Sequence, residues 1–317
     1  MTSENLLDPE LMPFLAALQT SELSNESLPG LRAGFKAMLS KMPISPSPNV
    51  QVESHSVPGP AGAPPVRVIC YRPTTTNSPL PGMLHLHGGG YVLGLPEMMD
   101  AANRRLTSEL GCAIFSVDYR LAPETQFPGP LEDCYAALAW LHANASKLGI
   151  DARRIGVKGE SAGGGLAAAL ALLARDRSGP PLAFQHLIYP MIDDRTCIDP
   201  DPNPFTGEFV WTPAENRFGW SSLLGKQPGS SDVPAYAAPA RAESLHGLPP
   251  TFIGIGSLDL FLDETLAYAR RLSRAGVPVE LHVYPGAFHR FYDAQEATVA
   301  RAAERDSREA IKRIMHE

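Results

Sequence analysis

The pentapeptide Gly159-Glu160-Ser161-Ala162-Gly163 is the stretch with the clearest potential for chemistry. The short apolar run 154–158 before it predicts a strand, and the small-residue run 162–174 after it predicts a buried helix. A G-x-S-x-G sequence between a strand and a helix is typical of a nucleophile elbow, a strained turn that holds a serine hydroxyl away from the sheet. Glycines are expected beside the turn because a Cβ atom there would collide across it. Chance matches are also expected in a chain with 27 glycines, so the rest of the sequence must decide.

A catalytic serine needs a base within hydrogen-bond reach, and that base needs an acidic partner to orient it. In a parallel sheet such partners lie at the carboxyl ends of strands. Asp259 follows the predicted strand 251–256 at such a position and is the preferred acid. Asp263 is the alternative, although Asp263 and Glu264 lie where the N-terminal cap of the next helix is expected.

The base is sought among nine histidines. His289 lies in a loop directly after the last predicted strand, 277–284, and so occupies the expected place. The chain order of Ser161, Asp259 and His289 is also that of the α/β hydrolases. The other histidines fall within predicted strands, on surface-like segments or before a glycine run: His55, His85, His87, His142, His186, His246, His282 and His316.

Three consecutive glycines, Gly88, Gly89 and Gly90, follow the predicted strand 82–87. Attack of a serine on a carbonyl group puts negative charge on the carbonyl oxygen, which preorganised N–H donors must stabilise. Backbone N–H groups approach a substrate oxygen closely only where side chains are absent. We therefore predict an oxyanion hole in this glycine loop, with the N–H of Ala162, the residue after the serine, as a further donor.

Strands and helices alternate along most of the chain, which predicts an α/β fold with a mostly parallel eight-stranded sheet and helices on both faces. The first two strands are expected to form an antiparallel pair at a sheet edge. The predicted strands are 50–55, 66–71, 82–87, 112–117, 154–158, 184–189, 251–256 and 277–284. The predicted helices are 9–20, 28–39, 97–110, 131–147, 162–174, 213–224, 263–275 and 293–315.

Composition narrows the class of partner. The net charge of −7 over 317 residues argues against nucleic acid and anionic membranes as partners. The N-terminal segment carries acidic residues before a short apolar run, so neither a signal peptide nor a membrane span is predicted, and a cytoplasmic protein is expected. Neither a metal nor a cofactor is expected. The four cysteines are interpreted as reduced, buried thiols: Cys70, Cys112, Cys134 and Cys197.

The sequence resembles the bacterial hormone-sensitive-lipase-like (family IV) esterases of the α/β-hydrolase superfamily over about residues 65–290. The resemblance implies that Ser161 is the nucleophile, His289 the base and Asp259 its orienter. It also implies an oxyanion hole from Gly89, Gly90 and Ala162, shaped by Gly88. The motifs that carry it are His87-Gly88-Gly89-Gly90, Asp118-Tyr119-Arg120-Leu121-Ala122-Pro123-Glu124, Gly159-Glu160-Ser161-Ala162-Gly163-Gly164, Asp259 with Asp263, and His289 with Phe291.

The family also implies a helical cap. Residues 191–238 interrupt the strand–helix alternation with a long insertion rich in proline and aromatic residues, and residues 1–48 are too few to form a core of their own. We expect 1–48 and 191–238 to form the cap, and 49–190 with 239–317 to form the catalytic domain. Three residues depart from the family pattern: Glu160, where Asp or Thr is commoner, Leu260 in place of a proline, and Arg290 in place of a glycine.

The expected function is hydrolysis of short- to medium-chain acyl esters of small molecules. Candidate pocket residues are Tyr91, Glu160, Phe205, Phe209 and Trp211. The cap aromatics could instead form the cap's own small core, and Glu160 could be either a buried partner or a surface charge. An amidase or peptidase with the same triad and a non-catalytic ligand receptor are the alternative functions. The resemblance further implies a homodimer through the last strand.

Overall fold

The computed structural model describes residues 3–18, 22–41, 47–76 and 79–316. Within these residues, eight strands form one sheet in the spatial order β1-β2-β4-β3-β5-β6-β7-β8. The strands are β1 (Val50–Val57), β2 (Val66–Pro73), β3 (Leu80–Leu86), β4 (Ala113–Asp118), β5 (Ile150–Glu160), β6 (Gln185–Ile188), β7 (Thr251–Gly256) and β8 (Val279–Tyr284).

The sheet is parallel except at one edge. β1 pairs antiparallel with β2, and β2 pairs antiparallel with β4. All other neighbouring pairs are parallel, and β8 forms the opposite edge. The predicted α/β class, the mostly parallel eight-stranded sheet and the antiparallel edge pair are confirmed.

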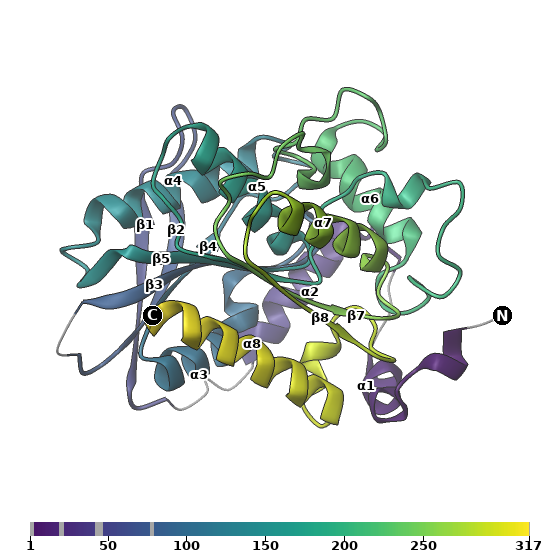
Figure 1. Cartoon of the computed structure of the whole chain (residues 1–317), viewed down its shortest axis with the longest axis horizontal. Helices are drawn as coiled ribbons and strands as arrows, with labels where there is room; N and C mark the ends of the chain where they lie inside the picture. The colour runs from purple at the N-terminus through teal and green to yellow at the C-terminus, as the bar shows by residue number, and fades with distance from the viewer. Residues whose placement is uncertain (1–2, 19–21, 42–46, 77–78, 317) are drawn as a thin grey trace.

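Helices cover both faces of the sheet (Figure 1). One face packs against α4 (Gly129–Asn144), α5 (Ala162–Asp176) and α7 (Leu262–Arg274), and the other against α3 (Asp100–Leu110) and α8 (Thr298–His316). The α5 helix is buried from Ala162 to Ala174. Its glycines and alanines allow close approach to the sheet, so α5 fixes the end of β5 firmly.

Three further helices flank this core: α1 (Met12–Ala17), α2 (Leu28–Lys41) and α6 (Pro213–Leu224). The α6 helix has the predicted bounds, and a capping box of Thr212 and Glu215 starts it. The 3₁₀ turns are η1 (Ser3–Leu6), η2 (Pro9–Leu11), η3 (Pro96–Met99), η4 (Thr196–Ile198), η5 (Pro239–Arg241) and η6 (Phe291–Asp293). Within the predicted segment 9–20 the structure has η2 and α1, and residues 1–2, 19–21 and 42–46 of the expected cap lie outside the described residues.

Side-chain contacts tie the N-terminal segment to the rest of the chain. The Ser3 backbone N–H and hydroxyl both donate to Glu208 Oε2, each at 2.6 Å, which joins the N-terminus to the 191–238 insertion. Arg32 Nε donates to the Val92 carbonyl at 2.8 Å, just after the glycine loop. Both expected parts of the cap therefore contact other parts of the chain near the carboxyl end of the sheet.

The start of the last helix differs most from the sequence prediction, whereas other helix boundaries shift by at most three residues. The last helix was expected from residue 293, with Asp293 at its start, but α8 begins at Thr298. Asp293 instead closes η6, where its carboxylate pairs with the Arg290 guanidinium at 2.8 Å. The interpretation of the cysteines is confirmed, since all four are buried free thiols. Among the described residues, every helix is too short or too polar to span a bilayer.

Candidate active site

The serine turn is strained and sterically locked. Ser161 joins β5 to α5 with φ 55° and ψ −120°, a region that side chains rarely adopt. A Cβ atom at Gly159 would lie 2.1 Å from the Gly163 carbonyl oxygen, and one at Gly163 would lie 2.0 Å from the Leu86 carbonyl oxygen. The glycine requirement is thus confirmed. The close approach of Gly163 to Leu86 also shows that the elbow packs directly against the end of β3.

Three side chains from different strand ends meet at this turn. His289 Nε2 lies 2.9 Å from Ser161 Oγ, and His289 Nδ1 lies 2.8 Å from Asp259 Oδ2. Asp259 Oδ1 accepts the Phe261 backbone N–H at 3.0 Å, which orients the carboxylate. All three side chains are at least 95% buried. With Nδ1–H donated to Asp259, Nε2 can accept the serine proton, which is the geometry of nucleophilic acyl transfer.

The geometry separates the two candidate acids. Asp259 contacts the histidine, whereas Asp263 is exposed and accepts a long 3.5 Å contact from Asn203 Nδ2. The interpretation of Glu264 as a helix cap is wrong. Its buried carboxyl group accepts the backbone N–H groups of Ile192 and Asp193 at 2.7 and 3.1 Å. Burial raises the pKa of Glu264 well above its usual value.

The glycine loop lies directly against the serine turn. Gly89 and Gly90 have φ of 125° and 59°, which favour glycine. A Cβ atom at Gly88 would lie 3.0 Å from the Glu160 carbonyl oxygen and 3.3 Å from Ser161 Cβ. In the described part of the chain, the N–H groups of Gly89, Gly90 and Ala162 donate to no protein acceptor, so they are available to a ligand.

Residues 83–293 match the protein family described as the α/β-hydrolase fold. The chain is an α/β hydrolase. Carboxylesterase NlhH of Mycobacterium tuberculosis is 35% identical to it over 327 residues, covering 100% of both chains. Ethyl acetate hydrolase of Pseudomonas putida is 36% identical, covering 72% of this chain and 71% of its own.

Solved structures agree with this assignment. A bacterial heroin esterase superposes on this hydrolase with a TM-score of 0.91 at 40% identity, covering 100% of both chains. A hyperthermophilic esterase of the archaeon Pyrobaculum calidifontis gives a TM-score of 0.82 at 31% identity, covering 97% of this chain and 98% of its own. The predicted fold, the resemblance to the hormone-sensitive-lipase-like esterases and the class of activity, carboxylic ester hydrolysis, are confirmed. The roles of individual residues remain predictions.

Aromatic rings enclose the histidine of this hydrolase. The His289 ring centroid lies 4.7 Å from that of Tyr189, 5.2 Å from that of Phe261 and 6.1 Å from that of Trp211. The sequence analysis missed Tyr189 and Phe261 as site residues. Their positions in the sequence could have identified them, because Tyr189 directly follows β6 and Phe261 lies two residues after Asp259. These rings limit the access of water to the imidazole.

The predicted pocket aromatics occupy different places. Trp211 covers the glycine loop, since a Cβ atom at Gly90 would lie 2.2 Å from its ring. Phe209 packs on Phe288, the neighbour of His289, at a centroid distance of 5.9 Å. Tyr91 is 1% exposed and donates its hydroxyl to the Met191 carbonyl at 2.9 Å, so it braces the loop from inside. Phe205 is half-buried, with its N–H bonded to Asn203.

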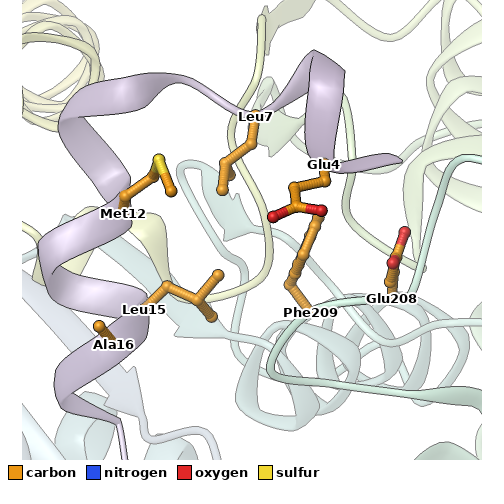
Figure 2. A pocket seen from close by; sticks show the side chains of 7 residues that line it. All are labelled: Glu4, Leu7, Met12, Leu15, Ala16, Glu208 and Phe209. Atoms are coloured by element: carbon orange, nitrogen blue, oxygen red, sulfur yellow. The ribbon is translucent and has the colours of Figure 1, made fainter. Parts of the chain in front are cut away.

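A pocket of about 200 Å³ opens between the N-terminal segment and the insertion (Figure 2). Figure 2 shows apolar side chains from α1 on one side and Phe209 facing them, with Glu208 at one end. Its lining residues are Glu4, Leu7, Met12, Leu15, Ala16, Glu208 and Phe209. Of the five predicted pocket residues, only Phe209 lines this pocket.

Glu160 was expected at the substrate pocket, but its side chain points into the sheet. Its Oε2 lies 2.9 Å from His85 Nε2, and its Oε1 forms an ion pair with Lys158 Nζ. Of the two interpretations of Glu160, the buried partner is therefore the one the geometry supports. Burial lowers the pKa of His85 well below its usual value and lowers the pKa of Lys158 to about 8.

Asp259→Asn tests the orienting contact. The amide cannot hold His289 in the tautomer that accepts the serine proton, so we expect kcat for p-nitrophenyl acetate to fall about 10⁴-fold with little change in fold. The matched control is Asp263→Asn, at the exposed alternative acid, which should retain kcat within about twofold because it does not touch the histidine. Equal losses in the two variants would contradict the assignment of Asp259.

Proposed function

We propose that Ser161, His289 and Asp259 hydrolyse carboxylic esters through an acyl-enzyme intermediate. The observation that carries the proposal is the His289 ring, which bridges Ser161 Oγ at 2.9 Å and Asp259 Oδ2 at 2.8 Å. In the first step Ser161 Oγ attacks the ester carbonyl carbon while His289 Nε2 takes the hydroxyl proton. The alcohol then leaves with that proton, and water repeats the sequence to release the acid.

The proposed oxyanion hole lies on the other side of the serine. The N–H groups of Gly89, Gly90 and Ala162 would donate to the oxygen that becomes negative in the transition state. Two facts support this role: these N–H groups donate to no acceptor within the described residues, and the glycine loop lies against the elbow. Ala162 is also the first residue of α5, where the helix dipole favours negative charge.

We propose the division into two parts expected from the sequence. Residues 49–190 with 239–317 would form the catalytic domain, and 1–48 with 191–238 the cap. The contact of Ser3 with Glu208 supports a common cap, because it joins the two segments. Phe14 stacks on Phe288 at 6.3 Å and Trp211 lies 6.1 Å from His289, so each segment sends a ring to the histidine loop.

The substrates are proposed to be small-molecule esters with short- to medium-chain acyl groups. Tyr189, Phe261 and Trp211 surround His289 with large rings, which restrict the space for an acyl group beside the serine. The name of the Pseudomonas putida relative, ethyl acetate hydrolase, is consistent with a short acyl group.

Ser161→Ala tests the nucleophile. The variant keeps the fold but lacks the attacking oxygen, so we expect hydrolysis of p-nitrophenyl acetate to fall by at least about 10³-fold. A fluorophosphonate probe should label the unmodified protein at residue 161 and leave the variant unlabelled. Ser146→Ala is the control, because Ser146 is exposed on a loop after α4. Full esterase activity in purified Ser161→Ala would sink the proposal, and a faster reaction with anilides than with esters would favour the amidase alternative.

A series of p-nitrophenyl esters from acetyl to palmitoyl tests the pocket. We expect kcat/KM to peak at a short or medium chain and to fall beyond it, because the large rings around His289 restrict the space for a longer chain. Phe209→Ala should move the peak to longer chains. Ile198→Ala, a change at an exposed residue of the same insertion, should leave the profile unchanged. A maximum at palmitoyl in the unmodified protein would contradict the proposal.

We also propose a homodimer through β8. This strand forms a free edge of the sheet among the described residues, and Val283 on it is 42% exposed. Light scattering at micromolar concentration should give twice the mass of one chain. In Val283→Lys the measured mass should fall to that of one chain. Met38→Lys, at an exposed residue of α2, is the control. A single-chain mass for the unmodified protein would contradict the dimer.

A further inference from the structure

A row of buried polar side chains crosses the centre of the sheet, outside the residues of the proposed mechanism. Neighbouring strands place Ser116, His85, Lys158 and His186 side by side in register. All four are 6% exposed or less. Buried polar and charged groups are costly unless they are paired. Hydrophobic packing does not explain why these polar side chains are buried, so their hydrogen bonds and ion pairs must be considered.

The contacts within this row converge on Glu160. The ring of His85 bridges Ser116 Oγ at 2.7 Å and Glu160 Oε2 at 2.9 Å. Because burial lowers the pKa of His85 well below its usual value, the ring is neutral and has one N–H. Nε2–H then donates to Glu160, and Nδ1 accepts the Ser116 hydroxyl. Lys158 pairs with the second Glu160 oxygen, so both oxygens are held.

The position of this contact links it to the chemistry. Glu160 is the last residue of β5 and directly precedes Ser161. His85 lies on β3, whose end leads into the loop of Gly88, Gly89 and Gly90. The Glu160–His85 bond therefore joins the strand that presents the serine and the Ala162 N–H to the strand that presents the glycine N–H groups.

The two strand ends also touch above this bond. Gly88 lies so close to the elbow that a Cβ atom on it would be 3.0 Å from the Glu160 carbonyl oxygen. A Cβ atom on Gly163 would collide with the carbonyl oxygens of Leu86 and His87. The backbone after β3 and the backbone after β5 thus meet at van der Waals distance. The hydrogen bond between His85 and Glu160 fixes the position of one strand end relative to the other.

We propose that Glu160 is a positioning residue that, through His85, sets the distance between the glycine loop and the serine elbow. It thereby holds the donors on β3 and the donor on β5 at the spacing that one oxyanion requires. This inference rests on the proposed oxyanion hole. Glu160 touches neither substrate nor reacting atoms and acts only through the two strands.

Two substitutions at His85 test the link with matched chemistry. A glutamine amide reaches the position of Nε2, so His85→Gln can retain the bond to Glu160. An asparagine amide reaches only the position of Nδ1, so His85→Asn keeps the Ser116 contact and loses Glu160. We expect His85→Asn to lower kcat/KM for p-nitrophenyl acetate about 10- to 100-fold, since a small displacement of catalytic groups has effects of this order. His85→Gln should recover most of that loss.

A trifluoromethyl ketone separates positioning from mere loss of stability. It binds by adding Ser161 Oγ to its carbonyl carbon, which places an oxyanion in the hole, so its Ki reports on donor spacing. In His85→Asn and in Glu160→Gln we expect Ki to rise by the factor by which kcat/KM falls, with KM changed less than about threefold. Labelling with a fluorophosphonate to completion gives the concentration of reactive active sites. Rates are divided by this concentration, so unfolded protein does not lower the measured kcat.

Ser307→Ala is the control for a buried bond lost from the same face of the sheet. Ser307 Oγ on α8 lies 2.7 Å from His186 Nε2, one strand beyond Lys158 and away from the elbow. This variant should lower the melting temperature and leave kcat/KM and Ki within about twofold.

Equal Ki values for His85→Asn and His85→Gln, or an unchanged Ki in Glu160→Gln, would overturn the positioning role. The His85 pair decides the matter if Glu160→Gln does not fold. Failure of the unmodified protein to hydrolyse esters or to react at Ser161 would refute the proposed function instead, so the two failures are distinguishable.

Discussion

The backbone strain at Ser161 is the constraint on which the rest of the site depends. A non-glycine residue at φ 55° and ψ −120° persists only where surrounding structure over-determines it. Here the Ser161 N–H donates to the Ile188 carbonyl, and the Ser161 carbonyl accepts the N–H groups of Gly165 and Met191. The turn is thus bonded to the end of β6 as well as to its own helix. Its stability comes from the sheet and α5 together, and the hydroxyl direction follows from that frame.

Parallel strand order explains how distant residues reach this turn. β3, β5, β6 and β7 are consecutive neighbours in the sheet, so their carboxyl ends lie along one edge. The glycine loop, the serine and the acid each follow one of these ends, and the histidine follows β8. No long side chain is needed to span the site, because each group starts within a few residues of a strand. Short, buried side chains have little conformational freedom, which favours preorganisation.

The sequence was sufficient for the elements whose pattern is local. Short apolar runs that alternate with helical patterns predicted the eight strands. The elbow and the glycine loop were predictable because their glycine positions require a positive φ or a close backbone contact that other residues do not allow. Contacts between distant segments were not predictable in this way. Glu264 has the position of a helix cap, but its carboxyl group binds the backbone of residues 192–193. Side chains alternate between the two faces of a strand, and that of Glu160 lies on the face covered by α3 and α8, where it binds His85. Tyr189 and Phe261 reach His289 because β6, β7 and β8 pair side by side, so that the segments after these strands meet. Patterns of residue type identify which strand ends carry chemistry, whereas side-chain partners depend on register.

Burial of the triad has an electrostatic consequence. Asp259 is fully buried, and each of its carboxylate oxygens has a protein partner, His289 for one and the Phe261 N–H for the other. The aromatic rings around His289 offer few polar partners other than Asp259 to the imidazolium that the proposed reaction would form. In such a low-dielectric setting the Asp259–His289 interaction is stronger than it would be in water. The aromatic residues and the acid therefore act together: the rings exclude water, and the exclusion of water makes the single carboxylate effective.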